Sequence, residues 1–142
     1  MTSNAQRASA LVSVLRAAVE GDLQTVSAIC TEDVRVWSPA RTAASRQELV
    51  ESLGERDEAL AYADVEIVPL DVSGPYACAE WSVTLCRRPS PTDAATGSPG
   101  AGLNLHGAGV AEFRDEAICA LRLYWDEAAV LERLGEAAPA GH

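Results

Sequence analysis

The chain has 142 residues, the length of one domain, and 48% of them are hydrophobic, which is enough for a packed interior. Eleven basic residues, all of them Arg, oppose 21 acidic residues and give a net charge of −10. This charge repels nucleic-acid backbones and anionic membrane surfaces, so both are excluded as general partners. No apolar stretch approaches the roughly 20 residues of a membrane span, and the N-terminus lacks the pattern of a secretory signal.

The cysteines and histidines limit the metal and redox chemistry. Four cysteines, Cys30, Cys78, Cys86 and Cys119, show neither CxxC nor Cys/His ligand spacing. Such scattered residues are typical of buried thiols in a reducing cytoplasm, which is the expected location. His142 is the terminal residue and only one other histidine is present, so a His-rich metal site is excluded.

Two helices are expected at the N-terminus. Apolar residues at helical spacing predict a helix from about Gln6 to Glu20, ended by Gly21. Asp22 is a good N-cap for a short second helix through Cys30. The chain therefore begins with a pair of connected helices.

A strand and a third helix follow. Alternating residues predict a strand over 33–37, which Ser38-Pro39 stops. Ser45 and Glu48 have the spacing of a capping box, which predicts a helix through about Leu60.

The second half of the chain has a period of two, which is typical of strands. These strands are expected over residues 65–70, 76–86, 103–114 and 118–125, with turns at 73–75 and 115–116. Residues 87–102 are rich in Pro, Gly, Ser and Thr and predict a mobile loop. Asp126 is expected to cap a last helix from Glu127 to Leu134 that Gly135 ends, followed by a frayed tail at 136–142.

Helices followed by a run of strands predict an α+β domain. We expect a cone-shaped, curved antiparallel sheet wrapped around the long N-terminal helix. One face of such a sheet is covered and concave, whereas the other is open. The open face is expected to form a homodimer.

Several short motifs occur in a fixed order along this pattern. They are Gly21-Asp22-Leu23, Asp33-Val-Arg-Val before Ser38-Pro39, Ala79-Glu-Trp81-Ser-Val, Phe113-Arg-Asp-Glu-Ala-Ile118, Arg122-Leu-Tyr-Trp-Asp126 and Leu131-Glu-Arg-Leu-Gly135. Together they resemble the SnoaL-like branch of the nuclear transport factor 2-like superfamily, from about Ala10 to Gly135. We expect one domain over residues 1–142 with its core at about 6–135.

The resemblance implies a cone-shaped α+β fold, usually dimeric, with a deep apolar pocket for a small organic ligand and no cofactor. Its members include polyketide cyclases, ketosteroid isomerases, epoxide hydrolases, epoxide-opening cyclases and non-catalytic binding domains. The fold alone does not choose among these activities.

The ionisable residues of two of these classes are missing here. Ketosteroid isomerases have an Asp base at the position of Ser38, a Tyr donor at that of Val14 and a protonated Asp at that of Gly109. The residues of this chain cannot perform these three roles. Proton shuttling of that type is therefore not expected.

The Asp-Arg-Asp triad of limonene-type epoxide hydrolases falls near Trp81, Val83 and Leu123, which do not ionise. A shift of one residue brings in Glu80, Ser82 and Arg122 instead. Such a shift points each side chain to the opposite face of the strand.

His106 is a candidate catalytic residue because it is the interior residue expected to titrate near neutral pH. Strict alternation places it on the face opposite Gly107, Gly109 and Ala111, which align with the pocket. A bulge in this glycine-rich stretch would reverse that placement. The alternative is a structural or interface histidine.

Asp126 is the second catalytic candidate, because it ends a strand beside aromatic residues. Its alternative role is the N-cap of the last helix. Glu80 and Arg122 share strand parity and are expected to pair across the sheet or a dimer interface.

The predicted binding site is mostly apolar. Its wall is expected to contain Trp81, Val83, Phe113, Leu121, Leu123 and Trp125. Trp37 and Tyr62 are expected at the rim, and Ser38 is expected to orient a substrate oxygen. The small residues 107–109 and Ala111 either widen the cavity or allow close packing against a helix.

Three functions are compatible with these residues. The first is a cyclase or isomerase that folds a bulky, apolar polyketide- or terpenoid-like intermediate and needs little acid or base assistance. The second is a non-catalytic ligand-binding or regulatory domain. The third is an epoxide-opening hydrolase or pyran-forming cyclase with rearranged acids, drawn from His106, Glu80 and Asp126.

Overall fold

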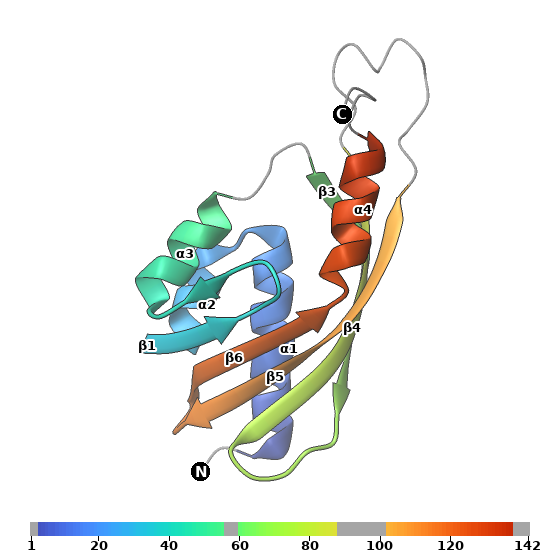
Figure 1. Cartoon of the computed structure of the whole chain (residues 1–142). Coiled ribbons are helices and arrows are strands. Elements are labelled where there is room, and N and C mark those ends of the chain that lie inside the picture. The colour runs from blue at the N-terminus through green and yellow to red at the C-terminus, as the bar shows by residue number, and fades with distance from the viewer. Residues whose placement is uncertain (1–2, 56–59, 88–101, 138–142) are drawn as a thin grey trace.

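The computed structural model describes residues 3–55, 60–87 and 102–137. Its elements are α1 (Asn4–Glu20), α2 (Leu23–Ile29), β1 (Cys30–Trp37), β2 (Thr42–Ala43), α3 (Arg46–Gly54), β3 (Leu60–Leu70), β4 (Tyr76–Arg87), β5 (Leu103–Arg114), β6 (Ala117–Trp125) and α4 (Glu127–Ala137). Figure 1 shows the three N-terminal helices beside a long, curved sheet. This order and the α+β class confirm the sequence prediction.

Helix α1 forms where the sequence predicts it, and local caps hold both of its ends. Ser3 and Gln6 make a capping box at the first turn. Gly21 adopts a left-handed backbone, with φ of 78°, at the other end. Leu11 and Leu15 lie on the buried side of α1, which packs against the sheet. The apolar stripe therefore anchors the core.

The region between the helices and the sheet departs from the prediction in two places. Helix α3 is capped by Ser45 as expected but ends at Gly54, so the helix predicted through Leu60 is too long. A two-residue strand, β2, pairs with the end of β1 and was not predicted. A strand this short leaves no alternation to recognise.

The six strands form one sheet in the order β2-β1-β6-β5-β4-β3. All neighbouring pairs are antiparallel except β1 and β6, which run parallel. The predicted turns are present: Gly74 has φ of 83° before β4, and Asp115 has φ of 58° between β5 and β6. The sheet is thus curved and unclosed, with one parallel pair near its β2 edge.

Two predicted element ends move in the structure. Strand β3 begins at Leu60 rather than Val65, because the pairing of β3 with β4 shifts between Ala63 and Glu66 and this irregularity breaks the alternation. Helix α4 continues through Gly135 to Ala137. Most of the predicted loop (residues 88–101) and of the predicted tail (138–142) lies outside the described residues.

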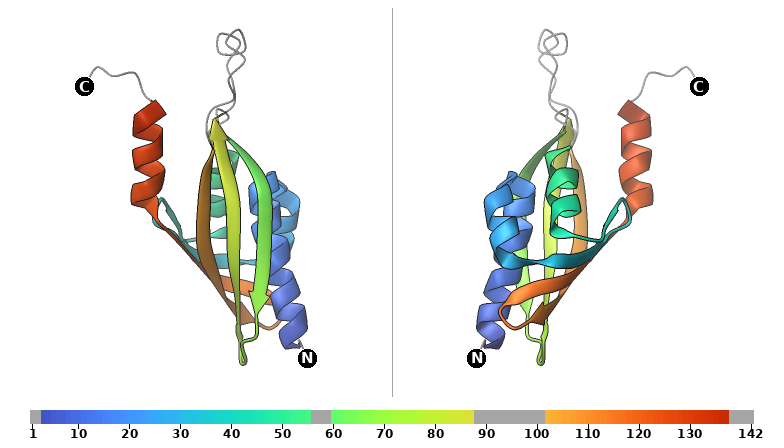
Figure 2. Two further views of the ribbon diagram at one scale, coloured as in Figure 1. Left: turned by 90° about the vertical axis from the view of Figure 1, so that its right-hand side faces the viewer. Right: turned by 90° about the vertical axis from the view of Figure 1, so that its left-hand side faces the viewer.

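The two faces of the sheet differ along every long strand. On β5 the odd-numbered residues face inward and the even-numbered residues face outward, and we name these sides the concave face and the outer face. Helix α1 packs against β3 and β4, whereas α4 approaches β5. Figure 2 shows these helices flanking strands β3 to β5, α1 beside β3 and α4 beside β5.

Candidate functional site

A pair of indoles lies on the concave face. Backbone pairing aligns Trp125 with Gly107 and Gly107 with Trp81, so Gly107 separates the two tryptophans. Their rings meet edge to face with centroids 6.0 Å apart, a favourable geometry for aromatic pairs. A Cβ at Gly107 would lie 2.2 Å from Cζ2 of Trp81 and 2.3 Å from the carbonyl oxygen of Tyr124. Glycine is therefore required for the pair to form.

The two indole N–H groups have different environments. Nε1 of Trp125 donates to the carboxylate of Glu127 at 2.5 Å. Nε1 of Trp81 is buried and has no hydrogen-bond partner among the described residues. An unpaired buried donor costs about 1–3 kcal/mol, so an acceptor from a ligand would stabilise this site.

Glu127 is a site residue that the sequence analysis missed. It is the first residue of α4, where an acidic residue is ordinarily explained by the helix dipole. The structure brings its carboxylate to the indole of Trp125. Its position two residues after Trp125 was the available indication, because the chain turns from strand to helix there.

The described side chains on the concave side of strands β4 to β6 are uncharged. Alternation and burial place Trp81, Val83, Leu85, Leu105, Gly109, Phe113, Leu121, Leu123 and Trp125 on this side. From Tyr76 to Cys86 of β4, and along β5 and β6, no carboxylate, imidazole or guanidinium group faces inward. The predicted wall residues therefore share one face, and these ranges supply it with no acid or base.

Part of this face is filled by α1. A Cβ at Gly109 would lie 3.2 Å from Leu123 and 3.5 Å from Leu15 of α1. Val83 and Phe113 are buried in the packed core. Of the two explanations for the small residues on β5, close packing against a helix fits Gly109. The indole pair lies on the same face, two residues along β5 from Gly109.

The predicted rim residues divide between the two faces. Tyr62 pairs with Leu85 on the concave face, and 38% of it is exposed. Trp37 instead lies on the outer face, with its ring 5.3 Å from that of Tyr124. Ser38 closes the turn after β1: its hydroxyl donates to the carbonyl of Arg41 and accepts from the same residue's amide. Trp37 and Ser38 are therefore not brought to the indole pair.

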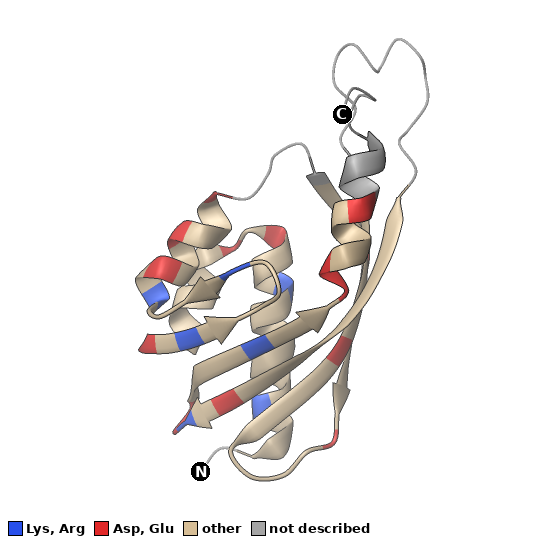
Figure 3. Ribbon diagram, viewed as in Figure 1, with Lys and Arg blue, Asp and Glu red and all other residues tan. Residues whose placement is uncertain are grey.

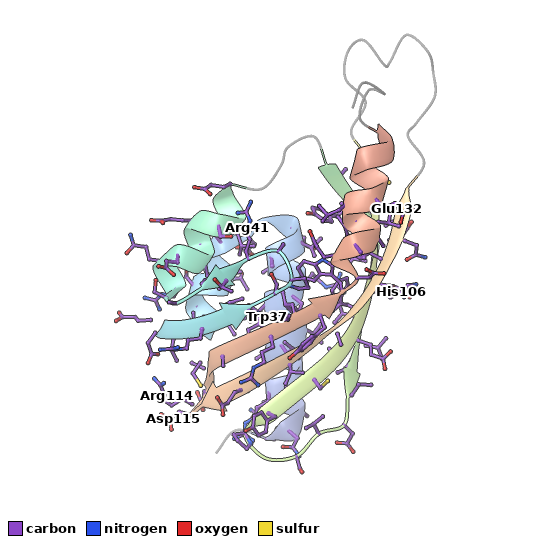
Figure 4. All side chains as sticks on the ribbon, viewed as in Figure 1. Trp37, Arg41, His106, Arg114, Asp115 and Glu132 are labelled. Atoms are coloured by element: carbon purple, nitrogen blue, oxygen red, sulfur yellow. The ribbon has the colours of Figure 1, made fainter. Side chains whose placement is uncertain are left out.

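The structure places His106 on the outer face. The pairing of β4 with β5 is unbroken from Tyr76 opposite Glu112 to Leu85 opposite Leu103, so no bulge turns His106 inward. Its exposed ring lies at the far side of β5 from the concave face (Figure 4). Of the two placements considered for this residue, strict alternation is correct.

The other candidate acids also lie apart. Asp126 caps α4, accepting the amide of Ala129 at 3.2 Å, as its alternative role requires. Glu80 and Arg122 both face outward, but β5 runs between them and no ion pair joins these two described residues. His106, Glu80 and Asp126 therefore form no catalytic group on the concave face.

The remaining chemistry of the described residues is limited. Burial raises the pKa of the Cys30 thiol to about 11, so this thiol is a poor nucleophile near neutral pH. No group of acidic, histidine or cysteine side chains in the described ranges is arranged to hold a metal ion. Within the same ranges, no helix is long and apolar enough to cross a membrane.

Solved structures share this fold. A candidate polyketide cyclase from Xanthomonas campestris pv. campestris is 21% identical and superposes with a TM-score of 0.73, over 93% of this chain and 99% of its own. An LEH-like epoxide hydrolase from M. tuberculosis is 18% identical, with a TM-score of 0.70 over 93% and 91%. At these low identities the likeness shows the fold alone.

The sequence comparisons identify a family but no individual curated relative. No curated protein matches the sequence significantly. The profile of the SnoaL-like domain matches residues 11–121, which include the C-terminal part of α1 and most of the sheet. The chain therefore belongs to the SnoaL-like domain family of the nuclear transport factor 2-like superfamily.

Proposed function

We propose that the protein is a cyclase or isomerase that binds a bulky, apolar polyketide- or terpenoid-like intermediate against the indole pair on its concave face. The observation that carries this proposal is the buried, unpartnered Nε1–H of Trp81 in an otherwise uncharged wall. The apolar wall folds the substrate, and the indole N–H orients one of its oxygens. Holding reacting ends together in this way supplies several kcal/mol without a strong acid or base.

Glu127 gives the proposed site one carboxylate. The hydrogen bond from Trp125 fixes it beside the indole pair. This group would accept or return a single proton, a role that neither His106 nor Asp126 can fill from the outer face and the helix cap. Members of the same fold that are described as cyclases and epoxide hydrolases support an activity on small organic molecules.

Ligand binding is tested with 9-fluorenone, a neutral flat ketone, by quenching of tryptophan fluorescence. Trp81→Phe keeps the ring but removes the donor, and should raise the Kd about two- to tenfold, the worth of one hydrogen bond. Trp37→Phe, on the outer face, is the matched control and should leave the Kd unchanged. Equal effects of the two variants would contradict the proposed site.

Catalysis is tested on the ligand that co-purifies with the protein. After extraction and renewed incubation, mass spectrometry should show an isomer of equal mass, and Glu127→Gln should slow its formation at least tenfold. A non-catalytic binding domain is the second candidate, favoured by the absence of charged groups among the described side chains on the concave side of β4 to β6, and it predicts an unchanged ligand. Gain of one water would instead indicate an epoxide-opening hydrolase.

We also propose a homodimer in the cytoplasm. The exposed apolar residues Val68, Leu70 and Tyr76 lie together on β3 and β4, and a second copy would cover them there. The four cysteines are free thiols, which a reducing compartment favours. Sedimentation of Val68→Asp tests the dimer, because a buried carboxylate would dissociate it.

A further inference from the structure

A cleft lies on the outer face, where β1, β6 and β5 run side by side. Its volume is about 410 Å³, within the range of small-molecule sites. Its lining includes Arg35, Trp37, Glu112, Arg114 and Arg122. Figure 3 shows basic residues on the neighbouring strands β1 and β6. This cleft is separate from the indole pair, which lies on the opposite face of the sheet.

The cleft concentrates positive charge in a chain whose net charge is −10. Arg114 is neutralised locally, because its two guanidinium nitrogens each lie 3.1 Å from a carboxylate oxygen of Asp33. Arg35 and Arg122 are exposed and have no ion-pair or hydrogen-bond partner among the described residues. Two guanidinium groups without an ion-pair partner therefore share the cleft with the carboxylate of Glu112, which accepts a hydrogen bond from Sγ of Cys119 at 4.0 Å.

Strand pairing brings these guanidinium groups to one small area. Arg35 lies opposite Ala120, and Trp37, two residues along the same face of β1, lies opposite Arg122. The two arginines thus occupy the diagonal of a square whose other corners are Trp37 and Ala120. Ala120 has a short side chain, so the space between the arginines stays open.

An aromatic wall adjoins the arginines. The rings of Trp37 and Tyr124 lie 5.3 Å apart, and 45% of each residue is exposed. Two exposed aromatic rings in contact with each other offer a surface on which a flat apolar group can stack. A flat apolar group can stack on them while its charged end reaches Arg122.

We propose that this cleft binds a small organic anion, with a carboxylate or phosphate-ester head on Arg35 and Arg122 and a flat, apolar body on Trp37 and Tyr124. The planar guanidinium group offers parallel N–H donors that match the oxygens of either head group. Glu112, at the other side of the cleft, opposes the anion and limits its affinity. The proposal goes beyond the activity on the concave face and does not depend on it.

The experiment is a fluorescence titration of the full chain with 2-naphthoate, 2-naphthyl phosphate and neutral 2-naphthamide. The two anions should quench Trp37 saturably, and the amide should bind at least tenfold more weakly. The stronger of the two anions identifies the head group. Inorganic phosphate alone should compete only weakly, because it lacks the flat body.

Variants locate the site. Arg122→Gln and Arg35→Gln should each raise the Kd of the anions about tenfold, the loss of a charge-assisted contact, and Glu112→Gln should lower it. Arg16→Gln removes an equal charge from the exposed side of α1 and is the matched control. Trp37→Phe should abolish the quenching by naphthoate but preserve that by 9-fluorenone.

Three results would overturn the proposal. They are equal binding of the amide and the anions, an equal effect of Arg16→Gln and Arg122→Gln, and quenching by naphthoate that survives in Trp37→Phe. Sedimentation at the same concentrations tests whether a second copy of the chain, and not an anion, occupies the cleft. If Arg122→Gln dissociates a dimer and no anion binds, the cleft is part of an interface between copies, and the anion site does not exist.

Discussion

The concave and outer faces of the same three strands, β4 to β6, have opposite chemistry. Among the described side chains of these strands, those on the concave face are apolar or small and include two tryptophans, whereas the outer face carries arginines, glutamates, His106 and exposed aromatic rings. Alternation alone produces this division, because each step along a strand changes the face. His106 therefore lies among charged residues on the outer face, where strict alternation places it.

The largest expected effect comes from shortening a concave-face residue. Ile118 is fully buried on β6, with 0% exposure, whereas 56% of Val68 is exposed on the outer side of β3. Ile118→Ala should lower the free energy of unfolding by about 2–5 kcal/mol, because it removes apolar contacts and leaves a cavity. At a dilution at which the proposed homodimer is dissociated, Val68→Ala should change it by about 0.5 kcal/mol or less. Urea unfolding measures both, and similar losses would mean that the outer face is covered in solution.

The next effect tests the two small residues on the concave side of β5. A Cβ at Gly107 would meet the Trp81 ring and a backbone carbonyl at contact distances that no rearrangement of a single side chain can relieve. Gly107→Ala should therefore cost about 1–3 kcal/mol and alter the near-ultraviolet circular dichroism of the indole pair. Gly109→Ala meets only flexible leucine ends and should cost less. The reverse order would show that the indole pair is not packed as described.

The elements were predictable where their local determinants are complete. The cap at Asp22, the left-handed Gly21 and the uninterrupted alternation of β5 fix their elements without help from distant residues. The predicted start of β3 is wrong because the irregularity near Asp64, where φ is 51°, breaks the alternation. Helix α4 passes Gly135, since glycine weakens a helix but does not always end it.

The site was less predictable than the fold. Alternation correctly placed Trp81 and Trp125 on one face, yet the contact of Trp125 with Glu127 depends on how the chain turns into α4. Trp37 and Ser38 are local neighbours in the sequence but take part in an outer-face ring contact and a turn. The tertiary arrangement decides which side of a strand end faces the candidate site. The residue pattern of a single strand does not contain this information.

Cys30 is buried opposite Ile118 and makes the free energy of unfolding depend on pH. Burial raises the pKa of this thiol from 9.0 to about 11, so the folded state holds the proton that the unfolded state releases. The associated stability is fully present below pH 9.0 and is lost as the pH rises toward 11, with a slope of at most about 1.4 kcal/mol per pH unit. Cys30→Ala should flatten the decline in unfolding free energy over this interval. Cys78→Ala, on the outer face, should leave it unchanged.

The smallest effect is expected at the acidic end of the pH range, from an exposed pair on the outer side. The hydrogen bonds from Arg114 hold the pKa of Asp33 below its ordinary value of 3.8. A lowered pKa in the folded state contributes stability above pH 3.8, and this contribution is lost as the pH falls through the lowered value. Arg114→Gln should therefore move the acid unfolding midpoint to slightly higher pH. Arg35→Gln removes the same charge from the same face without a carboxylate partner, so an equal shift in both variants would show that net charge, and not the ion pair, sets the acid limit of the outer face.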